Sequence, residues 1–182
     1  MGIDGTCCFT GHRAQRLPFR FEEQRPDGVR LKALLREEVE RLITAYHVTH
    51  FISGLALGAD LIAAETVLAL QARYPFITLE GAIPHLDQTV RWPEEQRARY
   101  ERAVRRCDRR TVLQDAYTPD CYRRRNRYMV AQSAHVLAIW DGGAGGTRQT
   151  VETARRLCRH LVVIDPVTWE ITEENPLYIA WE

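Results

Sequence analysis

The sequence contains very little lysine and no long apolar run. Its 25 Lys and Arg residues comprise 24 arginines and the single lysine Lys32, a bias along the whole chain that indicates genomic base composition rather than local selection. No run approaches the ~20 apolar residues that a membrane-spanning helix needs. The N-terminal MGIDGTCCFTGHR has neither a basic n-region nor an apolar h-region, which predicts no secretory signal. We therefore expect a cytoplasmic protein that does not contact a membrane.

The sequence also lacks the cysteine and histidine patterns of disulfide-rich and metal-binding proteins. Its five cysteines are an odd number and include no Cys-x-x-Cys pair, so neither a disulfide framework nor a zinc ribbon is expected. We interpret them as reduced thiols that serve as small hydrophobic side chains. The histidines have no metal-ligand spacing. The sequence thus predicts no metal site and identifies no cofactor.

A chain of 182 residues, 45% hydrophobic and 27% charged, is typical of one globular domain and excludes wholesale disorder. The net charge of +1 hides an uneven distribution. Between Arg97 and Arg127 there are 11 arginines against four acidic residues, a local excess of +7. Such a block could contact a phosphate-rich ligand or a nucleic acid. The alternative is a solvated helical face whose charges partly pair with one another.

Short β-branched runs alternate with longer helical stretches along the chain. We expect strands at residues 6–10, 48–53, 76–83, 111–114, 135–140 and 161–165, and helices at residues 27–46, 58–73, 94–107, 120–133 and 147–159. Continuous apolar strands that alternate with helices favour a parallel sheet covered on both faces. We therefore predict a single α/β domain over residues 1–182, a Rossmann-like doubly wound fold with a mostly parallel sheet. The tail, 166–182, has no clear period, and its apolar residues suggest that it packs on the domain and make a homodimer one option.

Three glycine-rich or small-residue segments follow predicted strands and open into predicted helices. Their candidate ligand-binding residues are Thr10, Gly11, His12, Arg13, Ser53, Gly54, Ala56, Gly58, Asp60, Asp141, Gly142, Gly143, Gly145, Gly146 and Thr147. The carboxyl ends of parallel strands meet at one edge of the sheet, where ligands of such folds bind. Glycine lets backbone N–H groups approach a phosphate, and the helix N-terminus favours an anion. The sequence therefore predicts a phosphate-bearing, nucleotide-type ligand at this edge.

The named nucleotide fingerprints are missing. The sequence has no G-x-x-x-x-G-K-[ST], and no G-x-G-x-x-G follows a strand with an acidic residue about 20 positions on. A kinase or an ordinary nicotinamide dehydrogenase is therefore disfavoured.

Further candidates lie outside these loops. Asn126 and Arg127 precede Tyr128, and charge beside an aromatic ring suits a nucleotide, although Tyr128 could equally belong to the core. Gln88 and Trp92 could form a wall of the pocket, with ordinary packing the better interpretation of Trp92. No catalytic residue stands out.

The weak catalytic candidates are Asp60, His12 and Arg127. The acid at position 60 could instead simply favour the helix dipole, and the histidine could support its loop.

Four motifs occur in the order FTGHR (9–13), FISGLALGADLIAAE (51–65), RNRYMV (125–130) and DGGAGGTRQTV (141–151). Together they resemble the SLOG superfamily, and more closely its YpsA-like branch, also called the DUF1273 family. Pro84, Gln88 and Trp92 fall where that branch has a P-x3-Q-x3-W pattern. The resemblance covers about residues 6–165. It implies a Rossmann-like fold and a pocket for a nucleotide or nucleotide-derived ligand, but no particular reaction.

The superfamily includes cytokinin-activating phosphoribohydrolases and the DprA proteins, which bind single-stranded DNA. SGLALGAD is similar to the S-G-x-A-x-G-x-D signature of DprA. The phosphoribohydrolases carry P-G-G-x-G-T-x-x-E with a catalytic glutamate, whereas here Asp141 replaces the proline and Thr150 the glutamate. Glu152 lies about 200° around the helix from Thr150 and cannot simply replace that acid. This departure disfavours nucleoside-monophosphate hydrolysis by the standard mechanism.

Three hypotheses follow. The favoured one is a nucleotide-ligand sensor or binding protein without chemistry of its own, because phosphate-cradle loops occur without a recognisable nucleophile, base or acid. The second is an enzyme that cleaves an N-glycosidic or phosphate bond of such a ligand. The third, less favoured, is a DprA-like protein that binds single-stranded nucleic acid through the arginines at 97–127.

Overall fold

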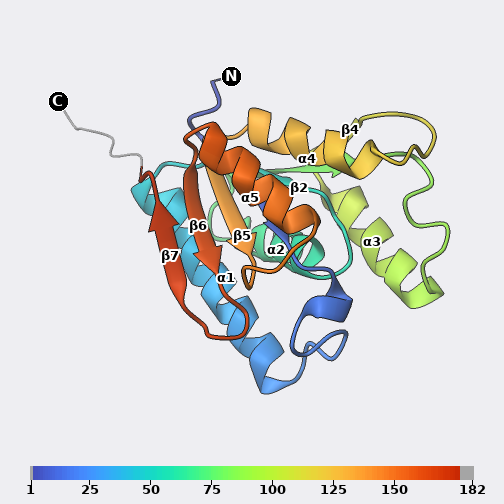
Figure 1. Cartoon of the computed structure of the whole chain (residues 1–182), viewed down its shortest axis with the longest axis horizontal. Helices are drawn as coiled ribbons and strands as arrows, with labels where there is room; N and C mark the ends of the chain where they lie inside the picture. Colours follow the sequence, from blue (N-terminus) through green and yellow to red (C-terminus); the bar gives the residue numbers. More distant parts are fainter. Residues whose placement is uncertain (1, 177–182) are drawn as a thin grey trace.

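The computed structural model describes residues 2–176, which form a seven-stranded sheet with helices on both faces (Figure 1). The strands are β1 (Thr6–Gly11), β2 (His50–Ser53), β3 (Thr78–Ile83), β4 (Arg109–Val112), β5 (His135–Ile139), β6 (His160–Ile164) and β7 (Ile171–Glu174). The helices are α1 (Pro26–Ala45), α2 (Ala59–Leu70), α3 (Glu94–Arg106), α4 (Cys121–Ala131) and α5 (Gly146–Arg156), with a short 3-10 helix, η1, at Ala14–Arg16. The strand order is β4-β3-β2-β1-β5-β6-β7, parallel except for β7. The predicted doubly wound α/β fold is confirmed.

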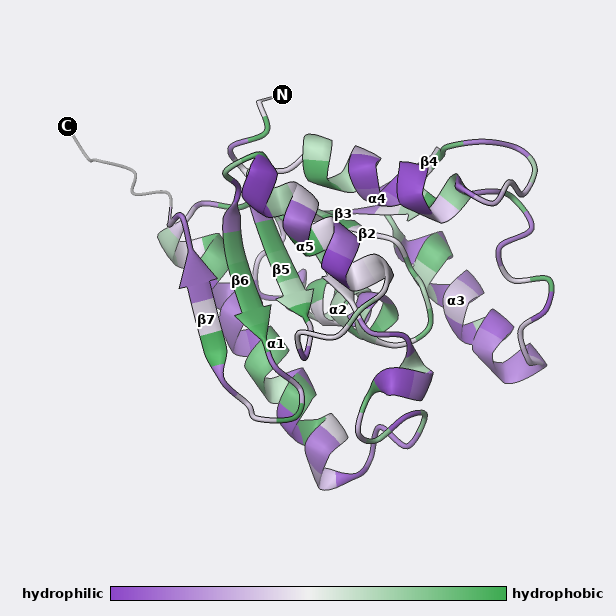
Figure 2. Cartoon of the chain, viewed as in Figure 1, coloured by the Kyte–Doolittle hydropathy of each residue, from purple (hydrophilic) through white to green (hydrophobic). Residues whose placement is uncertain are grey.

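Two hydrophobic cores lie on opposite faces of the sheet. Alternate residues of a strand point to opposite faces, so Cys7 and Phe9 of β1 enter the core formed with α1, α2 and α3, whereas Cys8 enters the core formed with α4 and α5. Central strands buried on both faces need no polar alternation, and β5 and β6 are buried throughout. Figure 2 shows these strands as hydrophobic and α3 as largely hydrophilic, since α3 buries only Tyr100 and Ala103.

The edge strands depart most from the sequence prediction. The predicted strand at 111–114 lies two residues earlier, at Arg109–Val112, and its side chains are mostly exposed. The prediction missed β7 in the tail, where Trp169 packs against the first core and Ile171–Glu174 pairs antiparallel with β6. Neither edge strand has the apolar pattern of a buried strand, because each has only one neighbour. Residues 177–182, where the predicted packing of the tail continues, lie outside the described residues.

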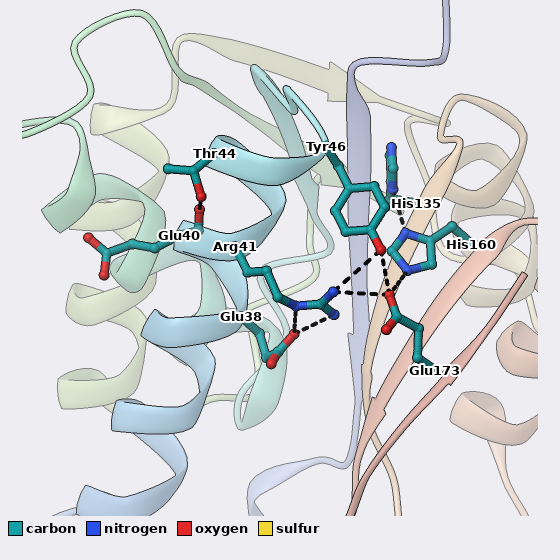
Figure 3. A network of polar contacts seen from close by, with 8 residues as sticks. All are labelled: Glu38, Glu40, Arg41, Thr44, Tyr46, His135, His160 and Glu173. Carbon is teal, nitrogen blue, oxygen red and sulfur yellow. Dashed lines mark hydrogen bonds and ion pairs between the residues drawn. The ribbon is translucent and has the colours of Figure 1, made fainter. Parts of the chain in front are cut away.

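A buried histidine pair, His135 and His160, lies at the amino ends of β5 and β6, and Glu173 of β7 packs against it (Figure 3). The Nδ1 atoms of His135 and His160 are 2.7 Å apart. His135 Nε2 lies 3.1 Å from the carbonyl of Asp4, and His160 Nε2 lies 2.7 Å from the Glu173 carboxylate, which also accepts from the Tyr46 hydroxyl at 2.8 Å. A hydrogen bond between two Nδ1 atoms needs one of them to be unprotonated and accept. The pair is therefore not compatible with two fully protonated imidazolium rings.

None of the helices within residues 2–176 is long and apolar enough to cross a bilayer. In the same part of the chain, no three His, Cys, Asp or Glu side chains gather in an arrangement that could hold a metal ion.

Candidate functional site

The strand order reverses between β1 and β5, which are neighbours in the sheet. From β1 the chain turns into α1 on one face, and from β5 it turns into α5 on the other. The segments after these strands, here called loop 1 (residues 10–16) and loop 3 (residues 140–147), therefore flank the crevice where doubly wound folds bind ligands. Loop 2 (residues 53–60) follows β2, on the other side of β1.

Loops 1 and 3 are tied together by side chains. His12, which is buried, places its Nε2 2.7 Å from the Asp141 carboxylate. Arg16 donates from Nη1 to the Ala144 carbonyl at 2.5 Å. Burial would raise the pKa of Asp141, but hydrogen bonds from the Gly143 amide and His12 outweigh it and hold that pKa below its usual value. The two loops thus form one rigid rim, and Arg16 is a rim residue for which the sequence offered no signal.

Loops 1 and 2 are joined through the backbone. The His12 carbonyl accepts from the Ala59 amide at 3.1 Å, and the Ala14 amide donates to Leu57 at 3.1 Å. Gly58 has φ +109°, and a Cβ there would lie 2.5 Å from the Ala14 nitrogen. At Gly11 a Cβ would lie 2.4 Å from that of Ala59. These two predicted ligand-binding glycines therefore let the chain pack on itself, and part of the α2 N-terminus is already hydrogen-bonded by protein.

The interior of loop 2 is also occupied by its own groups. Ser53 accepts from the Leu55 amide at 3.1 Å and donates to the Asp60 carbonyl at 2.8 Å. These bonds hold Leu55 in the left-handed region at φ +52°, which is uncommon for a residue with a side chain. Asp60 itself is 7% exposed. Ser53, proposed from sequence as a ligand donor, thus has its hydroxyl engaged in shaping the loop.

Arg125 is the principal residue of this region that the sequence analysis did not single out. Its guanidinium is 3% exposed and donates to the Gly54 carbonyl at 2.6 Å. A Cβ at Gly54 would fall 1.8 Å from Arg125 Nη1 and 2.7 Å from an Asp60 oxygen. Burial lowers the pKa of Arg125 and raises that of Asp60, and the attraction between the two charges opposes both shifts. Gly54 is therefore required for a buried pair of opposite charges.

Loop 3 differs because two of its four glycines face open space, whereas a Cβ at Gly143 would lie 2.5 Å from Arg16 Nη2. A Cβ at Gly142 or Gly146 would meet no atom within 4 Å, and Gly142 and Gly145 have φ of +83° and +137°. Among the described residues, the hydrogen bonds leave the amide N–H groups of Gly146, Thr147 and Arg148 without a protein acceptor, as expected for a first helical turn without a capping side chain. Together with the helix dipole, these donors make the start of α5 attractive to an anion.

Arg13 is, with Arg16, one of two exposed arginines of loop 1. Its guanidinium lies over the ring of Tyr122, 5.3 Å from the ring centroid. The neighbouring Thr10 is buried at the end of β1. The geometry leaves the guanidinium of Arg13 accessible at the crevice rim.

Asn126 and Arg127 lie in a different place from the loop residues. They line a polar cavity of about 320 Å³ between α4 and α5, together with Thr150 and Glu152. Neither Asp60 nor His12 lines this cavity, so the three weak catalytic candidates do not share one pocket. Asn126 does contact the buried Arg125–Asp60 pair, since its side-chain oxygen accepts a hydrogen bond from Arg125 Nε at 2.8 Å.

The arginine-rich segment 97–127 is divided between two faces of the sheet. Arg99 on α3 is paired with Glu23 and Glu65, and Arg125 on α4 is buried. Exposed arginines remain on α3, β4 and α4, namely Arg97, Arg102, Arg105, Arg106, Arg109, Arg110, Arg123, Arg124 and Arg127. The segment is therefore partly self-paired and partly available.

Comparison with known proteins places this geometry in a family. The YpsA model, described as the YspA SLOG family, matches residues 7–160. The SPbeta prophage-derived protein YoqJ of Bacillus subtilis (strain 168) is 29% identical over 143 residues, which are 72% of this chain and 84% of YoqJ. A UPF0398 protein of Bacillus pumilus (strain SAFR-032) is 26% identical over 175 residues, 93% of each chain.

Two solved structures share the fold. DNA processing protein A (DprA) of Streptococcus pneumoniae superposes with a TM-score of 0.58 at 18% identity, and that of Helicobacter pylori, described with its single-stranded DNA binding mode, with a TM-score of 0.57 at 22% identity. Each match covers 88% of this chain but only 50% and 65% of those longer chains. Since the family model matches well over half of the chain and includes all three loops, the chain belongs to the YspA SLOG family.

Proposed function

We propose that the protein binds a nucleotide or nucleotide-derived ligand at the crevice between loops 1 and 3 and acts as a sensor or binding protein. The observation that carries this proposal is the unpartnered first turn of α5 behind the open glycines of loop 3. Arg13 and Arg16 lie on the facing loop and add positive charge without entering the core. A phosphate would receive backbone N–H bonds from one side and a guanidinium from the other.

The burial and hydrogen bonding of the candidate catalytic side chains favour binding without turnover over catalysis. Asp60 is buried beside Arg125, and His12 is held by Asp141. A general base needs access to a substrate proton, and both side chains are already engaged by protein. An N-glycosidic or phosphate-cleaving enzyme remains the alternative, and turnover of a bound nucleotide would establish it.

We expect phosphate-bearing nucleotides to raise the melting temperature, and Arg13→Ala to weaken their binding about tenfold, the effect of losing roughly 1.4 kcal/mol. A ligand at 100 times its Kd adds about 2.7 kcal/mol to the free energy of unfolding, which a thermal-shift screen detects readily. The screen uses nucleotides, dinucleotides and ADP-ribose. Because Arg13 is exposed, its removal should leave the melting temperature of the free protein unchanged.

Arg156→Ala is the matched control, since Arg156 is also exposed but lines the cavity between α4 and α5. If Arg156→Ala rather than Arg13→Ala weakened binding, the ligand site would be that cavity. A panel with no shift at all would contradict the proposed function.

A second candidate function is binding of single-stranded nucleic acid, favoured by the exposed arginines of α3, β4 and α4 and by the fold shared with a DprA described by its single-stranded DNA binding mode. Each neutralised phosphate releases counterions, so the affinity for an oligonucleotide would fall steeply with salt. Absent or salt-independent oligonucleotide binding excludes it.

A further inference from the structure

A second cavity opens beside loop 1, beyond the carboxyl end of β3. It has a volume of about 500 Å³ and is lined by residues of the segment after β3, including His85, Gln88 and Trp92, and by Tyr117 and Tyr122 near the start of α4. Trp92 also packs edge-on against Tyr100 of the core, which confirms its predicted packing role.

The cavity contains two buried polar side chains whose polar atoms have no protein partner. His85 is 4% exposed and Gln88 5% exposed. Among the described residues, both ring nitrogens of His85 and both amide atoms of Gln88 lack a hydrogen bond. Leaving such atoms buried and unpaired is unfavourable, and native proteins rarely do so. Four donor or acceptor positions on residues that line this cavity are therefore left unsatisfied.

The walls around these groups are largely aromatic, and Asp87, Val90 and Arg91 complete the lining. The ring of His85 meets Tyr117 edge-on at 5.5 Å and Tyr122 at 5.9 Å, with interplanar angles of 75° and 79°. Flat aromatic rings with a few polar groups between them are the usual surroundings of a planar heterocycle, which stacks on the rings and hydrogen-bonds at its edge. The pairing of apolar faces with unpaired polar atoms thus fits a nucleobase better than an aliphatic or purely charged ligand.

Tyr122 connects this cavity to the anion-binding crevice. The Tyr122 ring contacts the His85 ring, which lines the cavity, and the guanidinium of Arg13 lies over the same Tyr122 ring. A cation at the mouth of an aromatic pocket is placed to neutralise a phosphate attached to a base through a sugar. The two features therefore match the two ends of one nucleotide.

We infer that the cavity lined by His85, Gln88, Tyr117 and Tyr122 binds the base of the nucleotide, and that Gln88 selects an adenine-type edge. The Gln88 amide presents a donor beside an acceptor, which complements the N6–H donor and N7 acceptor of adenine. This inference rests on the proposed function for the phosphate end of the ligand, but it concerns different residues and can fail separately.

The test compares AMP, IMP, adenosine and ribose 5-phosphate by calorimetry in the wild-type protein and in Gln88→Met. We expect AMP to bind at least tenfold more tightly than ribose 5-phosphate or IMP. Met lacks the amide but has a similar volume, so Gln88→Met should remove most of this preference and leave ribose 5-phosphate binding unchanged. Because the Gln88 amide has no hydrogen-bond partner among residues 2–176, the free variant should be at least as stable as the wild type.

Gln71→Met is the matched control for stability, since the Gln71 amide donates to the Ile77 carbonyl and to Asp108 and its loss should lower the melting temperature. Equal affinities for AMP and ribose 5-phosphate, unaffected by Gln88→Met, would overturn the base pocket and keep the phosphate site. Binding of adenosine but not of ribose 5-phosphate would support the base pocket and refute the phosphate site. A preference for another base over AMP, or no binding by any probe, would overturn the inference.

Discussion

Gly54→Ala should destabilise the protein by about 3 kcal/mol, because the added methyl group would occupy the space of a buried guanidinium. The new Cβ would lie 1.8 Å from Arg125 Nη1, and Arg125 is too enclosed to swing into solvent. Moving it would break the 2.6 Å bond to the Gly54 carbonyl and leave the Asp60 carboxylate buried without its opposite charge. Urea denaturation of the variant and the wild type measures the difference.

Gly146→Ala is the matched control, since a Cβ at Gly146 meets nothing within 4 Å, and it should change the free energy of unfolding by less than about 0.5 kcal/mol. A double-mutant cycle assigns the cause. In an Arg125→Ala background, Gly54→Ala should cost less than about 1 kcal/mol, because the obstructing side chain is gone. Equal costs of Gly54→Ala in both backgrounds would show that the guanidinium does not occupy this position.

Acid should destabilise the protein below neutral pH through the buried histidine pair. Burial, reinforced by the neighbouring His160, lowers the pKa of His135 from 6.5 to about 4. Between these two values the unfolded chain binds a proton that folded His135 does not, so the free energy of unfolding falls as the pH falls. The loss approaches 1.36 kcal/mol per pH unit, or about 3 kcal/mol in all.

Urea denaturation at several pH values between 7 and 4 gives this slope. His135→Gln should make it shallower, because glutamine binds no proton in this pH range. Glu173 contributes to the loss mainly below pH 4.5, because its hydrogen bonds to Tyr46, Arg41 and His160 outweigh burial and lower its pKa from 4.5 to about 2. The slope between pH 7 and 5 therefore separates His135 from Glu173. An unchanged slope in His135→Gln would assign the acid sensitivity to other groups.

The parts of the fold that the sequence predicts well are those buried on both faces. Strands β5 and β6 and the helices that cover them follow directly from apolar runs and helical periodicity. The strands β4 and β7 at the two edges each bond to one neighbour and expose most of their side chains, so their residues carry little pattern. Chain periodicity thus reports burial, and it fails where a strand is held mainly by backbone hydrogen bonds.

The sequence predicts which edge of the sheet carries the three loops better than it predicts what their residues contact. Gly11 and Gly58 lie at the predicted sheet edge, yet they accommodate neighbouring backbone and Ala59 rather than a ligand. Arg125 is one of four arginines in a short helical segment, and only the docking of α4 turns this one inward. His85 directly follows Pro84 of the P-x3-Q-x3-W pattern, but its role depends on a cavity built from segments that precede and follow β4 in the sequence. Such details depend on tertiary packing that local patterns do not contain.

The position of β1 in the middle of the sheet has a consequence for how the chain folds as it is synthesised. Strands β1 to β4, with α1, α2 and α3, come from the first part of the chain and can assemble most of the first core before β5 and β6 add their residues to it. The edge of β1 that pairs with β5 remains unpaired until β5 is synthesised. Cys8, Ile52 and Ala82 remain exposed to solvent until α4 and α5 pack over them. Such late, long-range parallel pairing is slow and leaves apolar surface open to aggregation. The half-made sheet is therefore the stage of biosynthesis at which this protein most needs a chaperone.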